Sequence, residues 1–194
     1  MNSITIANKS VKPNLSIKTQ TLATIAAIVS AVALPQVFHV IGSVSGYGTV
    51  PGEIFLPMHL PIILVGLLAG PYAGAISGAF APVISYFLTG MPGIIMLPFM
   101  MIELCIYGLS AGLLRKIRVP ILGKVLISQV AGRMVRGVAI FFAVYALGNT
   151  MVSTSTILSS IVTGLPGLII QWCMLPLVTY YVESITKDES KVEK

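Results

Sequence analysis

Charged side chains are scarce in this sequence. Only 9% of its 194 residues are Asp, Glu, Lys or Arg, whereas soluble domains contain about 25%. Apolar residues make up 56% of the chain, and its length suits one compact domain. So few charges cannot cover the surface of a soluble protein of this size. The lipid bilayer is therefore the expected solvent for most of that surface.

The sequence also lacks the motifs of several common chemistries. Cys105 and Cys173 both lie in apolar runs and have no cysteine neighbour, which argues against a disulfide framework or a zinc site. There is no GxxxxGK[ST] loop for ATP, no HExxH, no GxSxG and no pair of carboxylates inside an apolar run. We therefore expect no catalytic residue, no cofactor and no bound metal.

Long apolar runs are what the sequence has in abundance. A helix needs about 20 mostly apolar residues to cross a bilayer. Six runs approach or exceed that length: residues 19–41, 54–69, 73–88, 94–114, 125–147 and 156–182. They predict an all-α membrane protein with six transmembrane helices over residues 19–182. A polar segment, 1–18, precedes this domain, and a charged tail, 183–194, follows it.

The positions of the basic residues predict the orientation of the chain. Outside the apolar runs, lysine and arginine occur before the first run, between the fourth and fifth, and after the sixth. The connections 42–53, 89–93 and 148–155 contain neither. The positive-inside rule then places both termini in the cytoplasm and these three connections outside the cell. Most of the basic residues behind the net charge of +6 lie at the predicted membrane edges. We therefore expect a multi-pass protein of the cell membrane and no nucleic-acid partner.

Three residues of the Asp, Glu, Lys and Arg types lie inside the apolar runs, where charge is costly and usually functional: Glu103, Arg133 and Arg136. At about 1.5 Å per residue, Glu103 and Arg133 lie at similar depths near the membrane midplane and can pair. This pair either joins two helices or belongs to a binding site. Arg136 shares a helix face with Arg133, which leaves a surplus positive charge. A carboxylate or phosphate ligand would neutralise it; alternatively, Arg136 reaches a carbonyl group or the external loops.

Uncharged candidates surround this cluster in the sequence. His39 and His59 fall near the external ends of the first two predicted helices, where each either binds a ligand or satisfies the local backbone. Tyr47, in the first external connection, is a candidate lid residue. Ala23, Ala27 and Ala31 recur every four residues along the first helix, so another helix can approach closely. Spacing alone leaves open whether that helix belongs to this chain or to another subunit.

Several short stretches resemble a known family. They are Leu56-Pro57-Met58-His59-Leu60-Pro61, Leu67-Leu68-Ala69-Gly70-Pro71, Leu88-Thr89-Gly90-Met91-Pro92, Leu97-Pro98-Phe99-Met100-Met101-Ile102-Glu103-Leu104, Tyr107-Gly108, and Ala131-Gly132-Arg133 with Gly137. Together they cover about residues 23–137, and they resemble the substrate-binding S components of energy-coupling factor (ECF) transporters.

This resemblance implies a specific function. Such subunits, mainly bacterial, capture a vitamin-like small molecule outside the cell and associate with a transmembrane coupling subunit and two cytoplasmic ATPases. It implies that the alanine stripe contacts the coupling subunit, and that the three external connections, including Met91, cover the substrate. The surplus cation favours an anionic vitamin, with pantothenate as the lead; pyridoxine-type, folate, cobalamin and queuosine-precursor ligands stay open. The alternatives are a stand-alone carrier or facilitator and a scaffold membrane protein without transport activity.

Overall fold

The protein is a bundle of α-helices. The computed structural model describes residues 15–192, with side chains described through 185, and every regular element in this range is helical. The helices are α1 (Ile17–Val44), α2 (Val50–Phe55), α3 (His59–Ala69), α4 (Pro71–Thr89), α5 (Leu97–Leu114), α6 (Ile121–Tyr145) and α7 (Ser155–Val192). Within the described range they supply six spans long and apolar enough to cross a membrane, with α2 and α3 forming one of them. The predicted fold class is confirmed.

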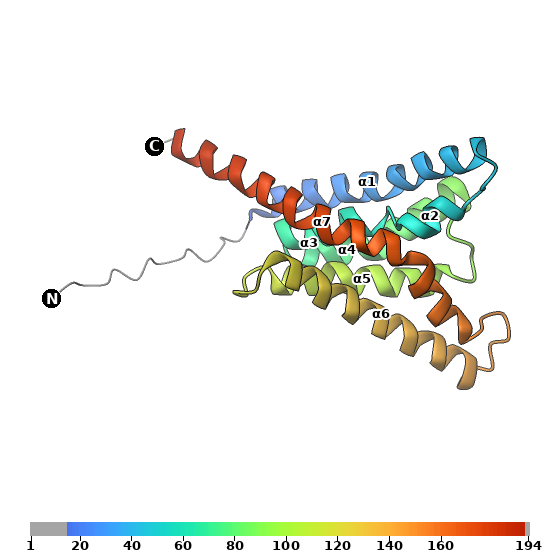
Figure 1. The fold of residues 1–194 in the computed structure, drawn as a ribbon. Coiled ribbons are helices and arrows are strands. Elements are labelled where there is room, and N and C mark those ends of the chain that lie inside the picture. Colours follow the sequence, from blue (N-terminus) through green and yellow to red (C-terminus); the bar gives the residue numbers. More distant parts are fainter. Residues whose placement is uncertain (1–14, 193–194) are drawn as a thin grey trace.

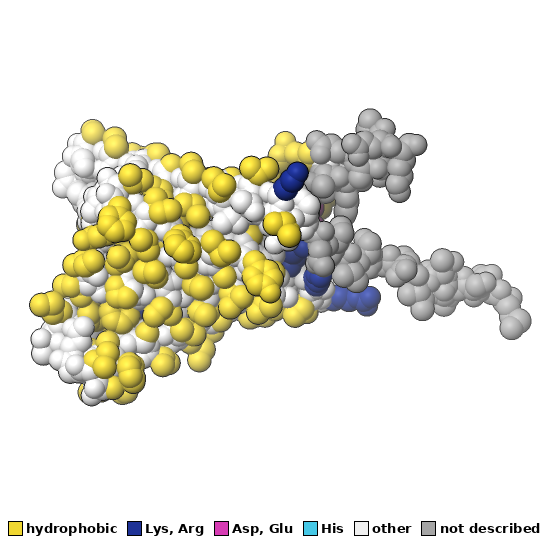
Figure 2. Space-filling view, turned by 180° about the vertical axis from the view of Figure 1, so that it is seen from behind, with side chains coloured by type: hydrophobic (Ala, Val, Ile, Leu, Met, Phe, Trp, Pro, Cys, Tyr) yellow, Lys and Arg dark blue, Asp and Glu magenta, His cyan; other side chains and the backbone are white. Residues whose placement is uncertain are grey.

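The surface of the bundle is apolar along its length and basic at one end. α1 begins and α7 ends at the same end of the bundle (Figure 1). Large apolar side chains such as Phe80, Phe141 and Leu158 are exposed, and the face in Figure 2 is covered with them. The Lys and Arg side chains visible there gather at a single end. Such a surface suits a bilayer with one end at a phosphate-rich interface.

The second span is broken, which corrects the single helix predicted for 54–69. α2 ends at Phe55, Leu56 adopts a left-handed conformation with φ 49°, and α3 begins at His59. Pro57 explains the break, because a proline disfavours the helical conformation of the residue before it. The connection predicted for 42–53 is also shorter than expected. α1 continues to Val44 and α2 begins at Val50.

Other helix ends differ from the predicted ones. α5 begins at Leu97, where Pro98 occupies a first-turn position that needs no N–H partner. α6 begins directly after Pro120, so it includes part of the predicted basic loop 115–124. The ammonium of Lys124 folds back and donates to the carbonyl of Arg115 at 2.9 Å. α7 continues to Val192, past the end predicted at 182.

Glycine allows α4 and α5 to pack backbone against backbone. A Cβ on Gly74 would collide with the carbonyl oxygen of Gly108, and a Cβ on Gly108 would collide with that of Gly74. Small residues at such a crossing bring helices into close van der Waals contact, which is the main attraction between helices in lipid. Beside this crossing, Ile62, Leu104 and Tyr107 are fully buried in the main apolar core.

The alanine stripe of α1 packs inside this chain. Ala27 clusters with Val65 and Ala69 of α3 and with Ala73 of α4, and Ala31 has no exposed surface. Helices of the same chain therefore cover Ala27 and Ala31, and the predicted contact of the alanine stripe with the coupling subunit stays a prediction. Ala23 is only half-buried at the edge of the same cluster, so it alone of the three stays open to a partner.

Replacing Gly108 by alanine should push α4 and α5 apart. Overpacking of this kind costs about 1–3 kcal/mol, so thermal unfolding of Gly108→Ala in detergent should occur at a clearly lower temperature than in the wild type. Gly137→Ala is the matched control, since a Cβ there meets only Ile157 at an ordinary 3.7 Å. Equal unfolding temperatures for the two variants would contradict the close crossing of α4 and α5.

Candidate functional site

A cavity of about 390 Å³ opens among the helices, within the size range of small-molecule sites. Its lining comes from the second half of α1, from α2, from the α2–α3 break with His59, from Ser85 of α4, from the 90–96 connection, from the first halves of α5 and α7, and from the second half of α6. These segments lie at the end of the bundle away from the start of α1 (Figure 1). The cavity and the basic end therefore lie at opposite ends of the molecule.

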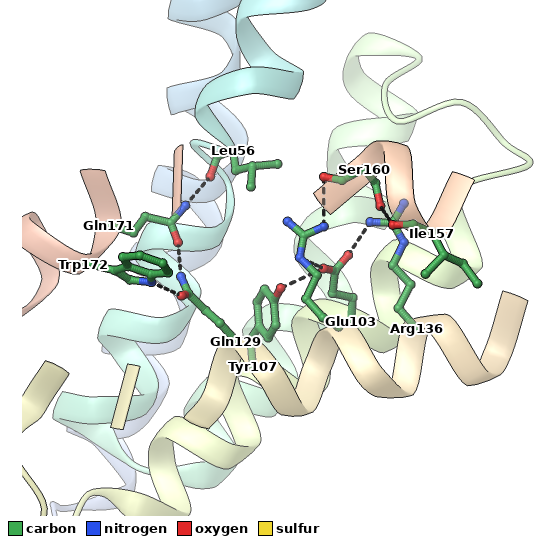
Figure 3. Close-up of polar contacts among 10 residues, drawn as sticks. Leu56, Glu103, Tyr107, Gln129, Arg136, Ile157, Ser160, Gln171 and Trp172 are labelled. Carbon is green, nitrogen blue, oxygen red and sulfur yellow. Dashed lines mark hydrogen bonds and ion pairs between the residues drawn. The ribbon is translucent and has the colours of Figure 1, made fainter. Parts of the chain in front are cut away.

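A buried carboxylate shared by two arginines forms the charged wall of the cavity. Glu103 on α5 has no exposed surface, and its Oε2 accepts from Nη1 of Arg136 at 2.7 Å. Nε of Arg133 lies 3.3 Å from the other oxygen, Oε1. Tyr107, one turn along α5, donates its hydroxyl to Oε1 at 2.8 Å (Figure 3). The predicted pairing of Glu103 with Arg133 is present, but the shorter contact is with Arg136.

The two guanidinium groups retain donors after these contacts. Nη1 of Arg133 donates to the backbone carbonyl of Ser160 on α7 at 3.2 Å. Nη2 of Arg133 and Nε of Arg136 are buried without a hydrogen-bond partner. A buried donor left unpaired costs free energy, and two cations facing one carboxylate leave one positive charge uncompensated. A carboxylate or phosphate could accept from these donors and remove both costs.

The rest of the lining has two chemical characters. One wall is hydroxyl-bearing and comes from α7: Thr156, Ser159, Ser160 and Thr163. Another part is thioether-rich and comes from the α2–α3 break, the 90–96 connection and α5: Met58, Met91, Met96 and Met100. Methionine adapts its shape to apolar groups, while hydroxyls donate and accept hydrogen bonds. The cavity can thus hold a molecule with one polar and one apolar side.

The structure brings together six of the seven residues predicted to bind the ligand. His39, His59, Met91, Glu103, Arg133 and Arg136 all line the cavity. His59 is only 2% exposed, neither of its ring nitrogens has a hydrogen-bond partner, and its ring centroid lies 5.4 Å from that of Tyr107. Tyr47 differs from the others: it lies between α1 and α2, is 68% exposed, and is absent from the lining.

A second polar network supports the cavity, and sequence reasoning missed it. Gln171 donates to the carbonyl of Leu56 at 3.2 Å and accepts from Gln129 at 2.8 Å, while the indole of Trp172 donates to Gln129 at 2.6 Å (Figure 3). The network connects α6 and α7 to the α2–α3 break. It does so through the backbone carbonyl of Leu56, which lies between the two helices. The signal available in the sequence was a single glutamine in each of the last two apolar runs, Gln129 and Gln171.

The described residues thus form six apolar spans around a cavity with a charged wall. The protein-family model described as ECF transporter, substrate-specific component matches residues 20–179, and the chain belongs to this family. No curated protein and no solved structure matches the chain. Members of the family are substrate-specific components of transporters, so the protein is a multi-pass membrane subunit of that class.

Removing the Gln171 amide should loosen the contact between α7 and the broken span. Gln171→Met keeps the side-chain volume but removes two hydrogen bonds, and it leaves the amide of Gln129 unpaired. We expect a loss of about 1–3 kcal/mol in stability, measured as a lower unfolding temperature in detergent. The control is Gln36→Met, because Gln36 makes only a 3.5 Å contact with Val32 of its own helix. A wild-type unfolding temperature for Gln171→Met would contradict this role of the network.

Proposed function

We propose that the protein is the high-affinity substrate-binding subunit of an ATP-driven ECF importer, and that it captures a small water-soluble vitamin outside the cell. The lead ligand is an anionic vitamin such as pantothenate. The observation that carries this proposal is the cavity itself, where two arginines share one buried carboxylate and still present unpaired donors. A pure scaffold would have no use for a cavity lined with unpaired donors, because each of them costs stability.

The proposed orientation follows from the charges at the two ends. The positive-inside rule places the basic end in the cytoplasm, and the cavity then opens toward the outside. The connections 42–53, 89–93 and 148–155 would cover the bound ligand from that side. Met91 already lines the cavity, and Tyr47 would belong to the part that closes over it.

Energy would come from partner subunits, because the chain itself contains no phosphate-binding loop for ATP. The proposed partners are a transmembrane coupling subunit and two cytoplasmic ATPases, in the plasma membrane of a bacterium. On α1, the half-buried Ala23 is the member of the alanine stripe that can still contact the coupling subunit. The rival function, a stand-alone carrier, would need neither partner.

A thermal-shift panel tests ligand binding directly. The purified protein in detergent would be heated with pantothenate, pyridoxine, folate, cobalamin or a queuosine precursor at equal concentration. A specific ligand at 100 times its Kd should stabilise the protein by about 2.7 kcal/mol, and we expect the largest shift with pantothenate. If no compound raises the unfolding temperature, the proposal of a vitamin-binding subunit is wrong.

Two substitutions should separate ligand binding from coupling. Arg136→Gln removes a cavity cation and should weaken binding of the anionic ligand at least about tenfold, since hydrogen bonds to charged groups contribute about 1.5–3 kcal/mol. Ala23→Leu should leave ligand binding nearly intact but reduce co-purification of the coupling subunit and the ATPases. Ligand affinity would be measured by calorimetry and association by pull-down from co-expressing cells. The opposite distribution of effects would overturn the assignment of both residues.

A further inference from the structure

The charge of the cavity depends on very few side chains. Its charged lining residues are Glu53, Glu103, Arg133 and Arg136. Glu53 is exposed on α2 and accepts from the hydroxyl of Thr49, the residue before this helix, at 3.2 Å. Water therefore solvates and screens its charge. The other three are largely buried, with side-chain exposures of 0% for Glu103, 11% for Arg133 and 17% for Arg136. Their formal charges leave one positive charge in the interior.

His59 does not change this balance. Its ring is buried, and neither nitrogen has a hydrogen-bond partner. A charged imidazole in that position would need an acceptor or an anion to offset the loss of hydration, and the carboxylate of Glu103 is already occupied by two guanidinium groups and a hydroxyl. His59 therefore suits a neutral form that can exchange hydrogen bonds with a ligand.

We infer that Glu103 sets the charge of the ligand that this cavity accepts, and that the charge is a single negative one. The inference deepens the proposed function, and it rests on the cavity being the substrate site. By neutralising one of the two arginines, the buried carboxylate leaves one positive charge beside the cavity, which one anionic group of a ligand would balance. Glu103 is thus the residue that distinguishes a monocarboxylate from a phosphate ester.

The burial of the three charged side chains supports this inference. A monoanion brings the buried cluster to neutrality, whereas an uncharged ligand leaves the surplus cation uncompensated. A dianion adds a negative charge that no buried cation balances. Uncompensated charge is costly where the effective dielectric constant is low. The same arithmetic predicts what happens when Glu103 loses its charge: the interior then holds two uncompensated cations and should favour dianions.

The test uses three ligands built on one carbon skeleton. Pantothenate carries a carboxylate, pantothenol carries an alcohol in its place, and the phosphate monoester of that alcohol carries a charge of about −2 at pH 8. Matching sets on the nicotinate and biotin skeletons cover the case in which pantothenate is the wrong vitamin. Affinities would be measured by calorimetry on the full-length protein in detergent. For the wild type, the carboxylate should bind at least about tenfold more tightly than either of its analogues. Leaving one buried charge unpaired costs more free energy than a tenfold change in affinity represents.

Three variants change the charge of the cavity in steps. Glu103→Gln should raise the affinity ratio of phosphate monoester to carboxylate at least about tenfold. Arg136→Gln, which leaves Glu103 paired with Arg133, should remove the preference for the carboxylate over the alcohol. The double variant Glu103→Gln with Arg136→Gln restores one positive charge and should restore the preference for the carboxylate, even if overall affinity falls.

Two controls separate charge from structure. Tyr107→Phe removes a hydrogen bond to Glu103 and keeps its charge, so it should affect all three ligands alike. Glu183→Gln makes the same carboxylate-to-amide change on α7, outside the cavity lining, and should leave the order of the three affinities unchanged.

Each outcome bears on one of the two proposals. If no member of any ligand set binds the wild type, this inference is wrong, and the thermal-shift panel above decides whether the vitamin-binding function stands. If the wild type binds the alcohol or the phosphate monoester as tightly as the carboxylate, the function stands and the inference is overturned. If the carboxylate is preferred but Glu103→Gln lowers all three affinities equally, Glu103 has only a structural role. The wild-type series needs no variant, so it decides the first part even if a variant fails to fold.

Discussion

The buried carboxylate of Glu103 is the constraint on which the site depends. A charge placed among lipid-facing helices is tolerated only where other groups replace its hydration, and here Arg133, Arg136 and Tyr107 do so together. Because these partners come from α5 and α6, the same contacts join the two helices. Arg133 extends the connection to α7 through the carbonyl of Ser160. One acidic side chain thus orients two arginines toward the cavity and links three helices around it.

The rest of the bundle holds this arrangement in place by close packing. Water cannot drive helices together inside a bilayer, so the helices are held by van der Waals contact and by hydrogen bonds between them. Gly74 and Gly108 bring α4 and α5 into backbone contact, and a Cβ on Gly132 of α6 would collide with the ring of Tyr107. The absence of a side chain at Gly132 therefore allows Tyr107 to stand beneath Glu103. The close packing at Gly132 thus helps to position the hydroxyl that Tyr107 donates to Glu103.

The broken second span shows how the fold creates a cavity within a closed bundle. The turn at Leu56 and Pro57 places Met58 and His59 on the cavity lining. The interruption exposes backbone groups that lipid cannot satisfy, and such a backbone is tolerated where protein groups bind it. Gln171 donates to the carbonyl of Leu56, and Gly167 lets α7 approach the carbonyls of Ile54 and Phe55. α7 thus supports the break and supplies the hydroxyl wall.

The sequence by itself determined the number of spans and singled out Glu103, Arg133 and Arg136 as charges inside them, because the cost of charge and of bare backbone in lipid is a local property of each segment. Only the tertiary structure decided which arginine lies closer to Glu103, that Ala27 and Ala31 pack against α3 and α4, and that Gln129, Gln171 and Trp172 form a network. These facts depend on how far each helix is rotated and how closely it approaches its neighbours. Rotation and approach follow from side-chain packing across the whole bundle, which no single segment contains.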